Sequence, residues 1–248
     1  MDDALKSDLI RRHFAPGESF TRDNLREFYS GNGEKDLNEN TLLSRIYGLK
    51  KKGVISSYER GHFVLGGRPD LDGLVQKEYR DLAAQIAAEL PHIRFTIWEL
   101  RSLMAIVGTG PEQNLVFVET DREACESVFD ELKAVRKDLF LKPDAEILNR
   151  YASMYENPII IKPLISEAPL DKVKKTVVPS LEKLCVDMMA EPVYFSEVKG
   201  QVYRDLVKKF FADNIINHSA LRRYASRRGS REEIENMLHS LNITLKTS

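Results

Sequence analysis

A cluster of glycine and proline residues divides this sequence into two parts. Three glycines and one proline fall within the eight residues from Gly66 to Gly73. This composition is typical of a hinge or linker rather than of a helix or strand. The chain has 248 residues, which is enough for two domains, because one domain takes roughly 100–200 residues. We therefore expect a small domain over residues 1–65, a linker over 66–73 and a larger domain over 74–248.

The first 65 residues predict the element order of a winged helix-turn-helix domain. Thr21 and Asn38 are suitable caps for two of its helices, and Gly53 is suitable for the left-handed residue that ends a helix. The first strand of a winged helix has no clear pattern, and it fits best at Ser19 and Phe20. The expected elements are helices over 4–14, 22–29 and 39–52, followed by strands over 54–57 and 62–65.

The residues after the linker predict an α/β layer that ends in helices, so the fold class is α+β or α/β. Short apolar runs alternate with amphipathic helical stretches, and residues 158–161 have the strongest strand pattern. Strands separated by helices indicate a sheet with at least some parallel pairing. The predicted strands are 93–97, 115–118, 139–141 and 158–161, and the predicted helices are 74–90, 98–104, 121–135, 145–155, 180–190, 195–211, 218–227 and 231–241.

Composition excludes several classes of protein. Hydrophobic residues make up 42% of the chain, and 37 Lys+Arg balance 38 Asp+Glu, which is typical of a globular protein and not of a disordered one. No apolar run approaches the length of about 18 residues that a membrane span needs, and no signal-peptide core follows the acidic N-terminus. The two cysteines, Cys125 and Cys185, form no disulfide framework and are expected in the core. We therefore expect a cytoplasmic protein without membrane contact.

The predicted third helix has two chemically different faces. At about 100° per residue, one face carries Leu42, Leu43, Ile46 and Leu49, which must point into the core. In a helix-turn-helix the second helix of the pair enters the major groove of DNA. Asn, Ser and Thr can read base edges there, whereas Arg and Lys suit phosphates. The candidate DNA-binding residues on this helix and on the following hairpin are Asn40, Thr41, Ser44, Arg45, Tyr47, Lys51, Lys52 and Arg60.

Positive charge is concentrated on this helix and hairpin. Residues 40–68 carry six basic residues against Glu59 alone, a net charge of +5, whereas residues 1–39 carry more acidic than basic residues. Arg60, at the tip of the hairpin, can reach a phosphate or the minor groove. Double-stranded DNA is therefore the expected partner. Lysines at a helix end also complement the helix dipole, and winged helices also dock proteins, so a protein-docking adaptor is an alternative function.

A second group of basic residues lies near the C-terminal end. Residues 205–231 carry seven basic and two acidic residues, a net charge of +5. Two interpretations remain open. The group can form a second anion-binding surface, or it can form salt bridges with the acidic segment 112–131, whose net charge is −6. The candidate residues of the second basic surface are Arg222, Arg223, Arg227 and Arg228.

No pattern of catalytic residues stands out, and we expect no enzyme activity, no metal and no cofactor. The segment 108–110 lacks the third glycine of a dinucleotide loop. Glu197 and Lys199 have the spacing found in metal-dependent nucleases, but they fall on a predicted helix and not on a strand. Glu119 and Asp121 end a predicted strand, as residues of a metal site can. A metal-dependent nuclease targeted by the winged helix is therefore the alternative from the enzyme class.

Four segments carry a resemblance to a known family, namely residues 40–55, 58–65, 179–187 and 221–229. With the order of domains, they make the sequence similar to the AbiEi-like antitoxins of type IV toxin–antitoxin systems. The resemblance implies a bacterial transcriptional repressor of its own operon that binds inverted repeats. It also implies that the larger domain helps in DNA binding, through its basic surface, and in antagonising a nucleotidyltransferase-type toxin. By the same resemblance, the DNA contacts fall on Thr41, Ser44, Arg45, Lys51 and Arg60.

Overall fold

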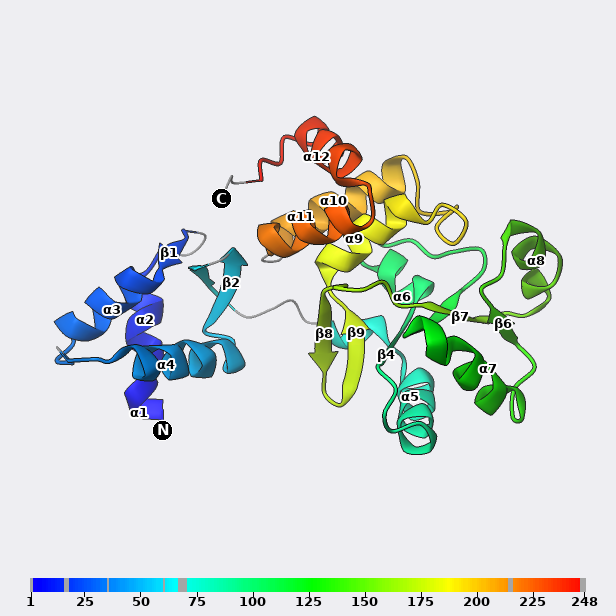
Figure 1. Ribbon diagram of the computed structural model, residues 1–248. Helices are drawn as coiled ribbons and strands as arrows, with labels where there is room; N and C mark the ends of the chain where they lie inside the picture. The colour runs from blue at the N-terminus through cyan, green and yellow to red at the C-terminus, as the bar shows by residue number, and fades with distance from the viewer. Residues whose placement is uncertain are drawn as a thin grey trace. The chain divides into compact units, whose positions relative to one another are not determined.

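The computed structural model describes residues 2–15, 18–34, 36–59, 61–66, 71–213 and 216–245 (Figure 1). The chain divides into two compact units. The first comprises residues 1–69, 210–220 and 244–248, and the second comprises residues 70–209 and 221–243. The sequence-based boundaries differ, because they place everything after residue 74 in one domain. Residues 67–70 of the predicted linker lie outside the described residues.

The first unit has the element order and the sheet of a winged helix, as predicted. Its elements are α1 (Asp2–Leu5), α2 (Ser7–His13), β1 (Phe20–Thr21), α3 (Arg22–Gly31), α4 (Glu39–Lys51), β2 (Ile55–Glu59) and β3 (His62–Leu65). The three strands are antiparallel in the order β1-β3-β2. The strand that has no clear sequence pattern is β1, where Phe20 pairs with Phe63 of β3.

Local side-chain chemistry sets the limits of the helix-turn-helix. The Thr21 side chain caps α3 and the Asn38 side chain caps α4, as the sequence predicts. After α4, Gly53 has a φ of 63°, and the N–H groups of Gly53 and Val54 donate back to carbonyls of the last turn. A Cβ disfavours this left-handed conformation, so glycine ends the helix here.

A core of aromatic and aliphatic side chains orients α4. It is built from Leu5, Ile10, Phe20, Leu25, Phe28, Tyr29, Leu42, Ile46, Leu49, Val54, Ile55 and Phe63. Leu42, Ile46 and Leu49 thus face inward, as predicted. The prediction for Leu43 is wrong, because its side chain is 42% exposed. Leu43 follows Leu42 by about 100° around the helix, which carries it beyond the buried face.

A mixed four-stranded sheet lies at the centre of the second unit. Its strands are β4 (Phe95–Glu99), β5 (Val116–Thr120), β6 (Leu139–Leu141) and β7 (Ile159–Pro163), in the order β4-β5-β7-β6. β7 is parallel to both β5 and β6, and β4 is antiparallel to β5, which confirms the predicted partly parallel sheet. Trp98 lies on β4 and not on a helix, and its buried ring stacks on Phe117 at 4.5 Å between centroids.

Helices connect and follow these strands. They are α5 (Lys77–Glu89), α6 (Leu100–Ala105), α7 (Cys125–Lys133), α8 (Ala145–Arg150), α9 (Leu181–Ala190), α10 (Gln201–Asp213), α11 (His218–Arg227) and α12 (Arg231–Ser240), with short 3-10 turns η1 (Asp72–Leu74), η2 (Arg122–Ala124) and η3 (Ala152–Met154). α10 begins later than the predicted residue 195, because turns ending at the left-handed Gly200 precede it. Cys125 and Cys185 are free and buried, as predicted. Within the described ranges, no helix is long and apolar enough to cross a membrane.

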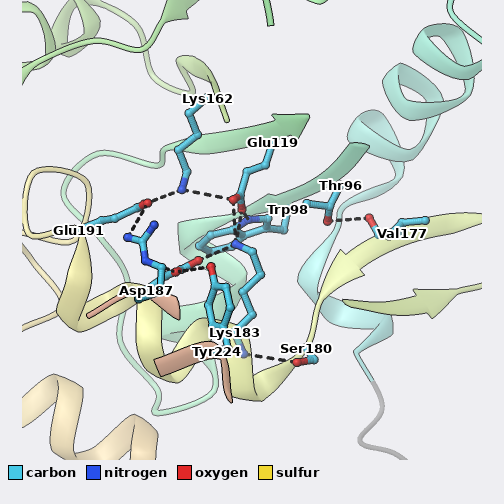
Figure 2. A network of polar contacts seen from close by, with 11 residues as sticks. Thr96, Trp98, Glu119, Lys162, Val177, Ser180, Lys183, Asp187, Glu191 and Tyr224 are labelled. Atoms are coloured by element: carbon cyan, nitrogen blue, oxygen red, sulfur yellow. Dashed lines mark hydrogen bonds and ion pairs between the residues drawn. The ribbon is translucent and has the colours of Figure 1, made fainter. Parts of the chain in front are cut away.

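A hairpin that the sequence analysis missed precedes α9. It consists of β8 (Leu170–Val173) and β9 (Thr176–Pro179), which pair antiparallel. The hydroxyl of Thr96 on β4 donates to the carbonyl of Val177 on β9 at 2.9 Å (Figure 2). The hairpin is therefore attached to the edge strand of the mixed sheet by a long-range contact.

Candidate functional site

α4 displays a polar face on the side opposite its buried residues. Asn40, Ser44, Tyr47 and Lys51 are all exposed, and Tyr47 is 69% exposed. Asn40 and Ser44 lie in the N-terminal half of the helix, and Lys51 is its last residue. The exposed Leu43 adds an apolar group of the kind that can contact a thymine methyl. The helix therefore offers amide, hydroxyl, aromatic and aliphatic groups on one surface.

Three consecutive exposed lysines close α4, and they make its C-terminal end positive. The ammonium group of Lys50 lies 4.9 Å from the centroid of the Phe63 ring on β3. Glu39, the one acidic residue in the sequence of α4, forms ion pairs with Arg22 and Arg26 of α3. The charge of Glu39 is thus balanced within the first unit.

Arg45 does not belong to the displayed face. Its side chain is 13% exposed, its guanidinium lies 4.5 Å from the centroid of the Tyr29 ring, and it forms an ion pair with Glu34. Burial raises the pKa of Tyr29 to about 12, although the neighbouring Arg45 acts in the opposite direction. Arg45 therefore positions α4 against α3. Thr41 is half-buried, and Arg60 lies outside the described residues.

The four arginines of the predicted second basic surface do not form one surface. Arg228 is 11% exposed and pairs with Asp187 at 3.5 Å and with Glu191 at 2.9 Å, so its assignment to a surface is wrong. Arg222 is 15% exposed and lies 3.6 Å from Glu235 on α12. These two side chains stabilise the helices of the second unit.

Arg223 and Arg227 are exposed, and both reach the segment that follows β7. Arg223 lies 3.7 Å from Glu167, and Nε of Arg227 donates to the hydroxyl of Ser166 at 2.8 Å. Four ion-pair partners of the arginines are seen among the described residues, and they lie outside segment 112–131: Glu167, Asp187, Glu191 and Glu235. These salt bridges are therefore not the ones with segment 112–131 that the sequence suggested.

A network of six charged side chains is buried in the second unit (Figure 2). Each of these side chains is at most 15% exposed. Its acidic members are Glu119, Asp187 and Glu191, and its basic members are Lys162, Lys183 and Arg228. Burying a charge is costly unless a partner compensates it, and here the numbers of opposite charges are equal.

Glu119 and Lys183 form the centre of this network. Nζ of Lys183 lies 2.7 and 2.8 Å from the two carboxylate oxygens of Glu119 and 2.6 Å from Asp187. Nε1 of Trp98 donates to Glu119 at 2.9 Å, and the ammonium of Lys162 lies 3.3 Å from the same carboxylate. Glu119 and Lys162 are also direct neighbours in the parallel register of β5 and β7.

These contacts decide the protonation state of Glu119. Burial acts to raise its pKa, but the positive charges of Lys162 and Lys183 outweigh burial and lower the pKa to about 2. The carboxylate of Glu119 is therefore ionised, and both of its oxygens contact lysine ammonium groups. This arrangement opposes the interpretation of Glu119 as a metal ligand. Across the described ranges, no group of three or more His, Cys, Asp or Glu side chains is placed to hold a metal ion.

Sequence reasoning missed this network, although it leaves a signal. Glu119 and Lys162 each follow three consecutive apolar residues in their strands. Lys183, Asp187 and Glu191 recur every four residues along α9 and its end. A charged residue in a strand that is otherwise buried on both faces indicates a buried ion pair. Charged residues four apart on one face of an apolar helix indicate the same.

The Glu-x-Lys pair also has a structural explanation. Glu197 and Lys199 lie in turns before α10, and neither is on a strand. The carboxylate of Glu197 accepts hydrogen bonds from the backbone N–H groups of Glu112 at 2.6 Å and Gln113 at 3.4 Å. The side chain thus fixes the loop that leads into β5.

The fold is that of a winged-helix unit joined to a mixed-sheet unit with a buried charge network. The chain belongs to a family described as "Family of unknown function (DUF6577)", whose model matches residues 41–244. The match includes most of α4, the strands β2 and β3 and nearly all of the second unit. No curated protein matches the sequence.

Replacing Glu119 by glutamine should reveal the contribution of the network to stability. We expect Glu119→Gln to lower the free energy of unfolding by about 3–5 kcal/mol near neutral pH, because two buried lysines lose their shared partner. The folded pKa of about 2 lies below the ordinary value of 4.5, so the contribution of Glu119 is complete above that ordinary value. It is lost as the pH falls through the folded pKa. Urea unfolding between about pH 7 and about pH 2.5 should therefore show the difference between the two proteins shrinking.

Glu126→Gln is the matched control, because Glu126 is exposed on α7. It should change the free energy of unfolding by less than about 0.5 kcal/mol at any of these pH values. A Glu119→Gln protein as stable as the wild type near neutral pH, or a difference that does not vary with pH, would contradict the role assigned to the network.

Proposed function

We propose that the protein is a DNA-binding transcription regulator that reads a duplex with α4. The observation that carries this proposal is the displayed face of Asn40, Ser44, Tyr47 and Lys51 on the second helix of a helix-turn-helix. In such proteins this helix lies in the major groove, with its N-terminal residues against base edges. We assign base contacts to Asn40 and Ser44 and phosphate contacts to the lysines at the end of α4.

Local electrostatics support this assignment. The formal net charge of the whole chain is −1, so any attraction to DNA must come from a local patch. Lys50, Lys51 and Lys52 form such a patch, and Glu39, the one acidic residue of α4, is paired with Arg22 and Arg26. Arg45 contributes to the proposal as the residue that holds α4 in place, and not as a phosphate contact.

The finer proposal is that this regulator is an AbiEi-like antitoxin. It is supported by the similarity of residues 40–55 and 179–187 to that family and by the order of the two units. The regulator then represses its own operon by occluding the promoter, and the second unit helps to antagonise a nucleotidyltransferase-type toxin. This mechanism contains no catalytic step by the protein itself.

DNA binding should depend strongly on salt. We expect about four phosphate contacts, from Lys50, Lys51, Lys52 and Arg60, so the logarithm of the affinity should fall with the logarithm of salt concentration with a slope of about −4. The measurement is fluorescence anisotropy on an inverted repeat from upstream of the protein's own gene. Lys51→Ala should reduce the steepness of the slope by about 0.9.

The matched control for this experiment is Lys133→Ala, because Lys133 is also the last residue of its helix but lies on α7 in the second unit. It should leave both the affinity and the slope unchanged. Binding that does not vary with salt, or no binding to the upstream DNA, would refute the proposed function.

Base reading by Asn40 is a separate prediction. Asn40→Ala should reduce discrimination at one base position by about 10- to 100-fold, because a good bidentate contact contributes about 1–3 kcal/mol of discrimination. Competition binding with single-base variants of the operator measures this loss. Lys51→Ala should instead weaken all sequences equally. Equal losses on every sequence for Asn40→Ala would exclude base reading by this residue.

The antitoxin proposal requires repression and toxin neutralisation in one cell. Expression of the protein should repress a reporter gene placed behind its own upstream region. Co-expression with an adjacent nucleotidyltransferase gene should restore the growth that the enzyme inhibits. Lys51→Ala should weaken repression and preserve growth. Retention of a protein partner without any repression or DNA binding would favour the docking-adaptor alternative.

A further inference from the structure

A surface cavity of about 610 Å³ lies at one edge of the mixed sheet, within the second unit. β5 ends there at Thr120 and β7 at Pro163, and these two residues are paired in the parallel register. In open α/β sheets, ligands bind in crevices outside the carboxyl ends of parallel strands. The volume also falls within the range of about 300–1,000 Å³ that is usual for small-molecule sites.

Three arginines from separate parts of the chain line this cavity. Arg94 precedes β4, Arg122 follows β5, and Arg227 ends α11. Arg94 and Arg122 are exposed, and neither forms an ion pair within the part of the chain that the structure describes. Nε of Arg227 donates to the hydroxyl of Ser166, so the guanidinium is oriented while its other N–H groups remain available. Guanidinium groups present a planar fork of donors that matches phosphate oxygens.

Carboxylates share the lining with these arginines. Asp121 and Glu123 follow β5, and Glu167 follows β7, where it lies 3.7 Å from Arg223. The cavity therefore offers strong donors and strong acceptors side by side. A ligand that satisfies both carries an anionic group together with hydroxyl or amino donors, and a nucleoside phosphate has this combination.

Two hydrogen bonds fix the frame of the cavity. The hydroxyl of Thr120 donates to the carbonyl of Arg94 at 2.9 Å, and the N–H of Leu164 donates to the carbonyl of Thr120 at 2.7 Å. These two bonds connect the start of β4, the end of β5 and the segment after β7. Glu167 has a φ of 62°, a left-handed conformation that a non-glycine residue rarely adopts. The lining is thus preformed by the fold of the sheet edge.

We propose that this cavity binds a nucleoside monophosphate. Arg94, Arg122 and Arg227 hold the phosphate group, and the carboxylates accept hydrogen bonds from ribose hydroxyls or base amino groups. The cavity has the volume of a small-molecule site, which favours a free nucleotide over the backbone of a DNA duplex as the source of the phosphate. The site does not depend on α4, and it is independent of the proposed DNA binding.

Isothermal titration calorimetry on the full chain tests the proposal. The probes are the adenosine, guanosine, cytidine and uridine monophosphates, with inorganic phosphate and adenosine as partial ligands. At least one nucleotide should bind with one site per chain, more tightly than inorganic phosphate, and adenosine should not bind. Arg94→Ala and Arg122→Ala should each weaken the nucleotide at least about 10-fold, because a hydrogen bond to a charged group contributes about 1.5–3 kcal/mol.

Arg204→Ala is the matched control, because Arg204 is an exposed arginine on α10 that does not line the cavity. It should bind the nucleotide like the wild type. Thermal unfolding without ligand should be the same for all three variants, and added nucleotide should raise the midpoint in the wild type and in Arg204→Ala alone. This second measurement separates loss of the site from loss of the fold.

Two results would overturn the proposal. One is the absence of binding by all four monophosphates at millimolar concentration. The other is a drop in duplex affinity for Arg94→Ala and Arg122→Ala as large as that for Lys51→Ala, because the arginines would then contact the DNA backbone. If Lys51→Ala loses DNA binding but still binds the nucleotide, the result supports a nucleotide site that is independent of DNA binding.

Discussion

The ion pair between Glu119 and Lys183 joins the mixed sheet to α9, and much of the second unit is arranged around it. An ionised carboxylate on a buried strand is tolerated only where a partner compensates it, and the packing of α9 against β5 brings Lys183 to Glu119. Asp187 then extends the pairing to the hydroxyl of Tyr224 on α11 at 2.8 Å. The same charge on Glu119 also favours the strand register that places Lys162 beside it.

The first unit relies on a different balance of forces. Its apolar core anchors three residues of α4, and the contacts of Arg45 with Tyr29 and Glu34 fix the helix from its flank. These contacts hold α4 by its buried face and its flank, and the exposed face opposite does not pack against the core. Asn40 and Ser44 lie on this exposed face, so packing does not explain why these positions carry polar side chains of these kinds.

Local patterns predicted the limits of α4 to within a residue, because Asn38 and Gly53 act on their own helix ends. They also predicted its displayed face. The burial of Arg45 was not predictable in this way, since its partners belong to another element. The hairpin β8–β9 was missed for a similar reason: its strands have only four residues each, and the hydrogen bond from Thr96 on β4 to Val177 on β9 joins residues far apart in the sequence, which no local pattern shows.

The spacing of charges alone does not tell a buried pair from a surface pair. Lys183 and Asp187 on α9 and Arg223 and Arg227 on α11 are each four residues apart, yet only the first two are buried. The difference lies in the surrounding sequence, because α9 is apolar on nearly all sides and its charges must find partners inside. Segment 179–187 thus serves the stability of the second unit, so the case for DNA binding depends on residues 40–55, where polar side chains remain exposed.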